Sequence, residues 1–289
     1  MTQHRHDDLH DRGLAFDLST LAGRAAAPVR LERRGALKLL AGAAGGLVLI
    51  GCGSSSDSST ASTLGTSTST TAGGPSTTAG APTSTEAVPE ETAGPYPGDG
   101  SNGPNVLTES GVVRSDIRSS FGSYSGTAAG LPLQIDLTVV EAGSGDPIDG
   151  AAVYLWHCDP EGRYSLYAQG ATEQNWLRGV QAADASGALS FTTVFPGAYM
   201  GRYPHMHFEV YPSIDAATSA GSRLVTSQLA LPVDACDAVY ATDGYEQSAS
   251  NYPRTPIDSD MVFSDGYDAQ MAAVTGDASA MVATLTFAV

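Results

Sequence analysis

Residues 131–139, Leu-Pro-Leu-Gln-Ile-Asp-Leu-Thr-Val, alternate apolar and polar side chains. Since successive side chains of a β-strand point to opposite faces of its sheet, this alternation predicts a strand with one buried face. The same period of two returns over residues 281–289, at the C-terminus. We therefore expect strands at both places.

Four more short apolar segments predict further strands. They cover residues 151–157, 189–194, 204–211 and 224–231. The helical candidates are two short segments, residues 234–240 and 268–274. Short strands separated by Gly and Pro favour a sandwich or barrel over alternating βαβ units. The sequence therefore predicts an all-β domain over residues 87–289, which is long enough to bury a substantial core.

One connection in this domain is unusually long. Residues 158–187 join the second and third predicted strands, and long connections in compact domains are usually functional. The connection is rich in aromatic and polar side chains, namely Tyr164, Tyr167, Gln174, Asn175, Trp176 and Arg178. We expect it to contribute to a functional site.

The N-terminus has the pattern of an export signal. The pair Arg33-Arg34 precedes an uncharged run, residues 39–50, which is too short to span a bilayer comfortably. A twin-arginine pair indicates the export route for folded proteins. The ending Leu49-Ile50-Gly51-Cys52 resembles a bacterial lipobox, in which Cys52 would be lipidated; the alternative is an ordinary cleavable signal with an incidental Cys. Residues 1–51 are thus predicted to be a signal peptide.

Residues 52–86 are rich in Ser, Thr and Gly and are predicted to form a flexible tether. With Cys52 lipidated, the tether would space the folded domain from the outer face of the cytoplasmic membrane or from the cell envelope. In that oxidising place Cys158 and Cys236 could form a disulfide.

The charge distribution excludes nucleic acid as a partner. Seven of the 14 basic and five of the 31 acidic residues precede Cys52, which leaves a formal charge of −19 for the rest. A protein that binds nucleic acid needs a clustered basic face to neutralise phosphates. Because an anionic membrane surface is equally unfavourable, we expect membrane contact only through the lipid anchor.

The histidines suggest a metal site. Only three of the six lie in the predicted domain, and His205 and His207 share one face of a predicted strand. Two adjacent imidazoles make half of a metal site, although solvent-facing or structural histidines would show the same spacing. With Glu209 as third ligand, the pair would suit a non-haem Fe(II) or zinc enzyme.

The surrounding sequence resembles the intradiol ring-cleavage dioxygenases. Residues 196–199 match the P-G-x-Y motif of that family, and Arg202, His205 and His207 match its R-x-x-H-x-H motif. Trp156 and Tyr164 fit the W-(x)7-Y stretch that carries the second tyrosine of the family. Residues 92–96, 178–181 and 184–187 resemble further segments of these enzymes.

The resemblance implies a transthyretin-like antiparallel β-sandwich with long functional loops and one or two short helices. It implies one Fe(III) per domain, bound by Tyr164, Tyr199, His205 and His207. Tyr164 and His205 would be permanent equatorial ligands, and Tyr199 and His207 axial ones. Tyr199 would leave the metal when substrate binds and would accept a catechol proton, while Arg202 would hold developing negative charge.

The implied reaction takes a small aromatic diol and O2. Both oxygen atoms enter a catechol-type ring, which is cleaved between its two hydroxylated carbons to a cis,cis-muconate-type product. The alternative is a function of a different class, in which the protein is a non-catalytic β-sandwich lipoprotein that binds a ligand or a cell-envelope polymer. The sequence does not decide the oligomeric state, and a homo-oligomer is possible.

The resemblance places five further residues around the metal or in the pocket: Trp156, His157, Arg178, Gly179 and Gln181. His157 stands where many members of the family have Gln, and Met200 stands where they often have Trp. By strand parity His157 points away from the face of Trp156, so we expect a supporting or structural role rather than metal ligation.

Overall fold

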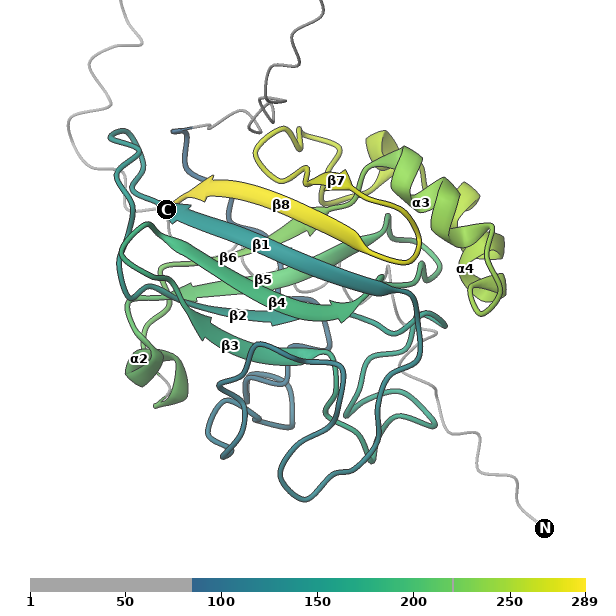
Figure 1. Cartoon of the computed structure of the whole chain (residues 1–289), viewed down its shortest axis with the longest axis horizontal. Helices are drawn as coiled ribbons and strands as arrows, with labels where there is room; N and C mark the ends of the chain where they lie inside the picture. Colours follow the sequence, from purple (N-terminus) through teal and green to yellow (C-terminus); the bar gives the residue numbers. More distant parts are fainter. Residues whose placement is uncertain (1–84, 220) are drawn as a thin grey trace, which may run out of the picture. The chain divides into compact units, whose positions relative to one another are not determined.

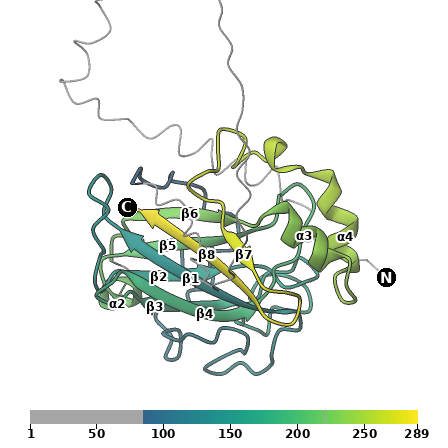
Figure 2. The same ribbon diagram turned by 45° about the horizontal axis from the view of Figure 1, so that its top comes forward.

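The computed structural model describes residues 85–219 and 221–289, so the predicted signal peptide and nearly all of the predicted tether lie outside the described residues. Two four-stranded sheets stack face to face (Figures 1 and 2). The first sheet has the order β4 (Ala188–Val194), β1 (Pro132–Val140), β8 (Met281–Ala288) and β7 (Ala273–Thr275). The second has the order β3 (Arg178–Ala182), β2 (Ala152–Trp156), β5 (His205–Tyr211) and β6 (Val225–Ala230). The predicted β-sandwich is confirmed.

The alternating pattern of the sequence decides which side chains enter the core. On β1, Leu133, Ile135 and Leu137 are buried between the sheets, while the polar residues between them face outward. On β5, Met206 and Phe208 enter the same core. The six predicted strands correspond to β1, β2, β4, β5, β6 and β8. All pairings of these strands are antiparallel except that of β1 with β8, which is parallel.

Two local predictions are wrong. The segment predicted as a helix over 268–274 forms turns and then β7, because Ala273 pairs with Thr284 of β8 and the Ala230 N–H donates to the Gln270 carbonyl at 2.9 Å. The connection 158–187 is also not a continuous loop, since β3 lies within it and pairs with β2. In both places tertiary pairing overrides the local pattern.

The helices are short. The predicted helix 234–240 is confirmed as α3 (Val233–Tyr240), whereas α2 (Ile214–Thr218) and α4 (Glu246–Asn251) were not expected. Two 3-10 turns follow, η2 (Tyr252–Arg254) and η3 (Ile257–Ser259). Figures 1 and 2 show α3 and α4 together at one end of the sandwich. Within residues 85–219 and 221–289, no helix has the length and apolar character needed to cross a bilayer.

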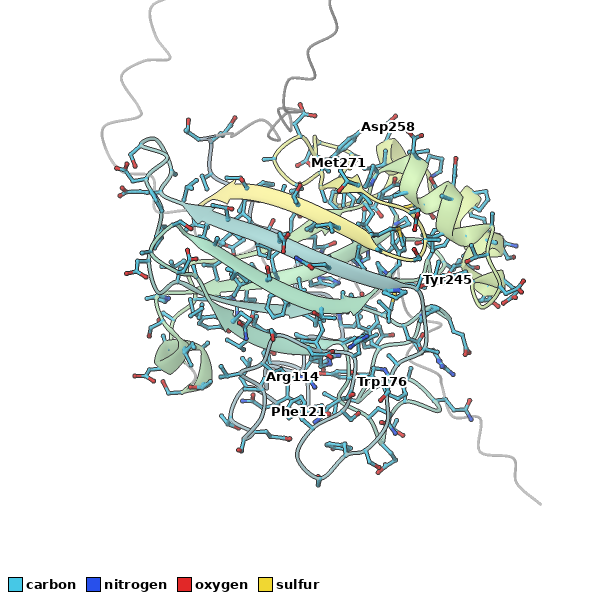
Figure 3. The ribbon with its side chains drawn as sticks, viewed as in Figure 1. Arg114, Phe121, Trp176, Tyr245, Asp258 and Met271 are labelled. Atoms are coloured by element: carbon cyan, nitrogen blue, oxygen red, sulfur yellow. The ribbon has the colours of Figure 1, made fainter. Side chains whose placement is uncertain are left out.

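The segment before β1 covers the outer face of the second sheet. Arg114 donates from Nε and Nη2 to the Arg178 carbonyl at 3.0 and 2.7 Å, and its guanidinium lies 4.4 Å from the Phe121 ring centre, below β3 (Figure 3). Apolar side chains of this segment pack on Tyr154 and Trp156. As a result all seven residues of β5 are buried, including those that point away from the core.

Candidate metal centre

His205 and His207 lie side by side on the outer face of β5, and both are buried. Their Nε2 atoms are 3.1 Å apart. The Nδ1–H of His205 donates to the Tyr203 carbonyl at 2.5 Å, which leaves the lone pair of Nε2 available. A backbone carbonyl on the far nitrogen is the usual way in which a protein orients a metal-binding imidazole.

Two tyrosine hydroxyls meet the same imidazole. The Oη atom of Tyr199 lies 3.2 Å from His205 Nε2, and that of Tyr164 lies 3.5 Å from it. Tyr164 comes from the loop that follows β2, and Tyr199 comes from the turn that follows β4. The structure therefore brings together all four residues that the sequence predicted as ligands.

The separations of these donor atoms fit a single metal ion. Two ligands that are each about 2.0–2.1 Å from one ion and roughly at right angles or tetrahedral to each other lie about 2.9–3.4 Å apart. Two of the observed separations around His205 Nε2, 3.1 and 3.2 Å, fall in this range, and the third, to Tyr164 Oη, is slightly longer at 3.5 Å. Imidazole nitrogens combined with phenol oxygens suit iron, so the residues present fit the predicted Fe(III).

Burial sets the protonation states of these groups. It lowers the pKa of His205 well below the usual value, and the nearby Arg202 adds to the effect. Burial is also the main reason why the pKa of His207 lies well below its usual value, and the neighbouring His205 is the second. The Thr92 backbone acts in the opposite direction and raises this pKa. Both imidazoles are therefore neutral at neutral pH, the form that binds a metal. Burial also raises the pKa of Tyr164, so its phenol needs an adjacent cation to ionise.

The loop that carries Tyr164 is shaped by Asp159. The carboxylate of Asp159 accepts from the Glu161 and Arg163 N–H groups at 3.0 and 2.9 Å and from Arg163 Nε at 2.8 Å. The Asp159 carbonyl accepts from the Gly162 N–H at 2.9 Å. These bonds fold the chain back on itself immediately before Tyr164.

Arg178 is a positioning residue of this loop rather than part of an open pocket. Its fully buried guanidinium donates to the carbonyls of Tyr96, Pro97 and Ser165 and to the Ser165 hydroxyl, at 2.8 to 3.0 Å. It thereby ties the Tyr164 loop to the covering segment. At Gly179 an added Cβ would lie 2.5 Å from a methyl of Ile117, which explains a glycine there. The Gln181 side chain donates to the adjacent Val180 carbonyl at 3.3 Å, and no hydrogen bond to a candidate ligand is found for it among the described residues.

Trp156 and His157 separate as strand parity predicted. The Trp156 ring stacks on His207, with centroids 4.9 Å apart and planes 7° apart. The Nδ1–H of His157 instead donates to the Cys158 carbonyl at 2.8 Å, so its Nε2 accepts from the Thr193 hydroxyl at 2.7 Å. Trp156 therefore supports a candidate ligand directly, and His157 joins β2 to β4.

Arg202 is only 1% exposed and is held by residues that the sequence did not point to. Its Nε donates to Asp260 Oδ2 at 3.0 Å, and its Nη2 donates to Gln228 Oε1 at 2.6 Å. Asp260 also accepts from the Tyr203 N–H at 2.7 Å, one residue from the peptide that orients His205. Asp260 and Gln228 lie 58 and 26 positions from Arg202, so no local pattern could have linked them.

The alternative site with Glu209 as third ligand does not form. Glu209 Oε2 accepts from the Tyr211 hydroxyl at 2.7 Å, and Oε1 lies 3.3 Å from Arg223 Nη1. Across the described part of the chain, no three His, Cys, Asp or Glu side chains are placed to share a metal ion. The disulfide is not formed either, because Cys158 and Cys236 are both free and buried.

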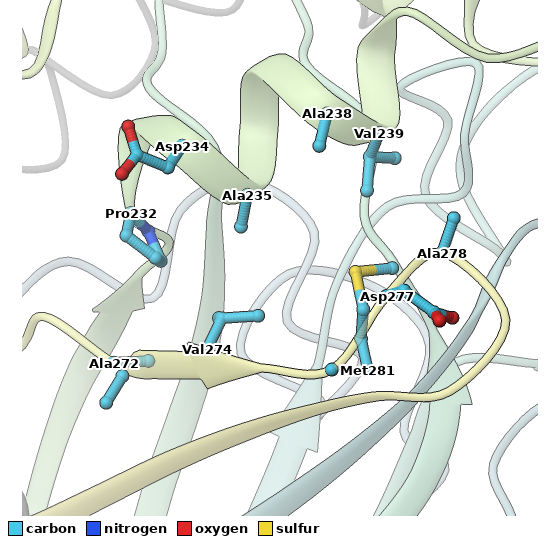
Figure 4. Close-up of a pocket in the computed structure, with 12 residues that line it drawn as sticks. Pro232, Asp234, Ala235, Ala238, Val239, Ala272, Val274, Asp277, Ala278 and Met281 are labelled. Carbon is cyan, nitrogen blue, oxygen red and sulfur yellow. The ribbon is translucent and has the colours of Figure 1, made fainter.

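A separate pocket of about 370 Å³ lies between α3 and β7 (Figure 4). Its wall is mainly apolar and includes Ala235, Val239, Val274 and Met281. None of the candidate metal ligands contributes to it. The chemistry of the site is thus not in this pocket but under the loops that cover the second sheet.

Comparisons with known proteins agree with this geometry. Residues 103–236 match a family model described as dioxygenase. Chlorocatechol 1,2-dioxygenase of Rhodococcus opacus is 25% identical over 172 residues, which are 48% of this chain and 64% of that protein. The chain thus spans less than two thirds of the length of that curated relative.

A solved structure shares the fold. The intradiol ring-cleavage dioxygenase from Tetranychus urticae superposes with a TM-score of 0.55 at 24% identity, covering 70% of this chain and 94% of that one. The matched residues include all four candidate ligands and Arg202. Residues 103–236 thus match the dioxygenase family model, and the described domain has the fold of an intradiol ring-cleavage dioxygenase.

Proposed function

We propose that this protein is a non-haem Fe(III) intradiol dioxygenase that cleaves a catechol-type aromatic between its two hydroxylated carbons and inserts both atoms of O2. The observation that carries the proposal is the convergence of the Tyr164 and Tyr199 hydroxyls and of His207 Nε2 on His205 Nε2, at 3.1 to 3.5 Å. Tyr164, Tyr199, His205 and His207 would hold the iron. When bound, Fe(III) would stabilise the phenolate forms of the tyrosines and take up the two oxygens of the catechol.

The histidines are prepared for this role by their surroundings. The Tyr203 carbonyl keeps the proton of His205 on Nδ1, so Nε2 faces the other donors as a lone pair. Trp156 lies flat against the His207 ring and restricts its rotation. Both side chains are therefore oriented before a metal arrives, which lowers the cost of binding it.

The two tyrosines differ in a way that suits two roles. Tyr164 is buried, whereas Tyr199 is partly exposed and is followed by Met200, which is 64% exposed. Tyr199 is thus the ligand with room to move aside, and its phenolate would accept a proton from the substrate. Arg202, oriented by Asp260 and Gln228, would place its guanidinium toward negative charge that develops on the substrate.

The visible spectrum of the iron-loaded protein tests the proposal. Tyrosinate bound to Fe(III) should give a charge-transfer band, and the band should shift when catechol, protocatechuate or hydroxyquinol is added in turn. Oxygen uptake with the same three compounds then identifies the class that is cleaved. Colourless, iron-free protein from an iron-replete culture would overturn the proposal, and a lack of oxygen uptake would favour a non-catalytic binding protein.

A matched pair of variants assigns the band. Tyr164→Phe removes a hydroxyl that faces His205, and it should bleach or shift the band and abolish turnover. Tyr167→Phe is the control from the same loop, because its hydroxyl donates to the Asn102 carbonyl and accepts from the Gly98 N–H. The control should keep the band. If Tyr164→Phe also keeps it, Tyr164 is not a ligand.

We also propose that the protein is exported by the twin-arginine route and anchored by a lipid on Cys52. The support is the sequence Leu49-Ile50-Gly51-Cys52 after a twin-arginine pair. Export in the folded state suits a protein whose buried site must be filled before it leaves the cytoplasm.

A further inference from the structure

The turn that carries Tyr199 is bound by the helical segment at the end of the sandwich. Four consecutive carbonyls of this turn, those of residues 195–198, each accept a side-chain hydrogen bond. The donors, in order, are the hydroxyls of Tyr245 (2.8 Å) and Tyr240 (3.1 Å), the thiol of Cys158 (3.3 Å) and the amide of Asn251 (3.0 Å). Three of the four donors belong to α3, to α4 or to the residue that precedes α4.

Ser248 of α4 connects this turn to the loop that carries the other tyrosine. Its buried hydroxyl donates to the Pro160 carbonyl at 2.6 Å and accepts from the Ala198 N–H at 2.8 Å. Beside it, the Gly197 N–H donates to the Asp159 carbonyl at 3.1 Å. The backbone before Tyr164 and the backbone before Tyr199 therefore meet at one serine.

The junction has no spare room. A Cβ added to Gly197 would lie 2.6 Å from both the Asp159 and Pro160 carbonyl oxygens and 2.7 Å from Ser248 Oγ. Two of these three atoms are backbone, so they could not move without shifting the Tyr164 loop. The distance between the two tyrosine-bearing segments is thus fixed by close packing as well as by hydrogen bonds.

We propose that α4, through Ser248 and Asn251, is the positioning element that holds the Tyr199 turn against the Tyr164 loop and so sets the separation of the two phenol ligands. This inference rests on the proposed function for the role of the phenols, but the junction itself does not depend on it. Among the described residues, the hydrogen bonds that Ser248 and Asn251 make to these two segments go to the backbone of Pro160 and Ala198 and not to the side chains of the candidate ligands. Their effect is transmitted through the backbone of residues 159–160 and 197–198.

The junction also determines which part of the turn can move. Both the N–H and the carbonyl of Ala198 are occupied by α4 side chains, so the chain is anchored up to the residue before Tyr199. Past this anchor, Met200 is exposed and Gly201 has a φ of 87°, which few other residues adopt. Displacement of Tyr199 therefore involves its own side chain and residues 200–201, and would lengthen the 3.5 Å bond from the Arg202 N–H to the Tyr199 carbonyl.

Hydrogen exchange on the metal-free protein tests the junction independently of iron and activity. Ser248→Ala removes the acceptor of the Ala198 N–H, and the exchange of that amide should become about tenfold faster. The amides of Gly162 and Arg163, which depend on Asp159, should also exchange faster. Ser250→Ala is the matched control, since Ser250 is exposed on the same helix and should change neither segment.

The iron-loaded protein gives the second readout. In Ser248→Ala the charge-transfer band should move and kcat should fall by about tenfold or more, since misplacing a ligand slightly is costly. Ser250→Ala should match the wild type. If Ser248→Ala does not fold, Asn251→Ala, which removes the bond to the Ala198 carbonyl, takes its place.

Each outcome has a definite meaning. Unchanged exchange at residues 162, 163 and 198 together with an unchanged band would overturn the positioning role of α4. Faster exchange confined to Ala198 would overturn the coupling to the Tyr164 loop. A wild-type protein without any iron band would overturn the proposed function instead, while the exchange rates would still decide whether α4 holds the two segments together.

Discussion

The buried pair of Arg202 and Asp260 should dominate the stability of the region around the candidate site. Arg202 Nε donates to Asp260 Oδ2 at 3.0 Å, and neither side chain is more than 1% exposed. Asp260→Asn keeps the shape of the side chain but removes the carboxylate that Nε and Nη2 of Arg202 contact. Breaking a buried pair from one side costs about 3–5 kcal/mol, because the remaining charge stays in a medium of low polarity.

The reverse change should cost less. In Arg202→Met, Asp260 keeps the N–H groups of Tyr203 and Val262, which donate to it at 2.7 and 2.8 Å. These two bonds would continue to stabilise the carboxylate, because hydrogen bonds to an ionised acceptor are strong. We therefore expect Asp260→Asn to lower the free energy of unfolding more than Arg202→Met does, and the double variant to lower it by less than the sum.

Urea unfolding of the metal-free protein gives the free energy of unfolding of the wild type, the two single variants and the double variant, which together form a double-mutant cycle. The coupling energy should be at least about 1 kcal/mol, which is within the range of contacting charged residues. Metal-free protein is needed because iron would add its own binding energy to the folded state. Effects that add to within about 0.5 kcal/mol would refute the reasoning, since they would mean that the two charges do not stabilise each other.

Two further predictions concern acid stability and the anchor. Burial lowers the pKa of His157 from 6.5 to about 4, so only the unfolded chain binds a proton as pH falls from 6.5 toward 4, and stability is lost over that window. His157→Gln should reduce the loss of unfolding free energy between pH 7 and pH 4.5 by about 2–3 kcal/mol, measured by urea unfolding, and an equal loss in both proteins would contradict this. Cys52→Ala should move the exported protein from the membrane fraction to the soluble fraction, and continued membrane association would argue against a lipid on Cys52.

Prediction from the sequence succeeded where the signal is local. On β5 the apolar Met206 and Phe208 alternate with His205 and His207, so the period of two identified both the strand and the face on which the imidazoles lie. The same argument placed His157 away from Trp156. Such patterns are visible because the burial of alternate residues acts on immediate neighbours in the chain.

Prediction failed where distant residues satisfy a buried polar group. β3 was missed because it begins with Arg178, whose charge belongs to the surface unless carbonyls from elsewhere surround it, and those of Tyr96 and Pro97 lie 82 and 81 residues away. Ser248 was missed for the same reason, with Ala198 50 residues and Pro160 88 residues from it. Only the tertiary structure reveals such partners.

The two histidines of the site are held by a β-strand, whereas the two tyrosines are held by loops, and this difference bears on the reaction. His205 and His207 lie on a strand that pairs with β2 on one side and with β6 on the other, so moving either imidazole would disturb the sheet. The tyrosines lie on loops, and the Tyr164 loop is fixed by Asp159 and Arg178. Tyr199 follows the last anchored residue of its turn and precedes exposed Met200. When a substrate needs room among the four donors, Tyr199 is therefore the one whose displacement breaks the fewest backbone contacts, and the proposed reaction requires that ligand to leave.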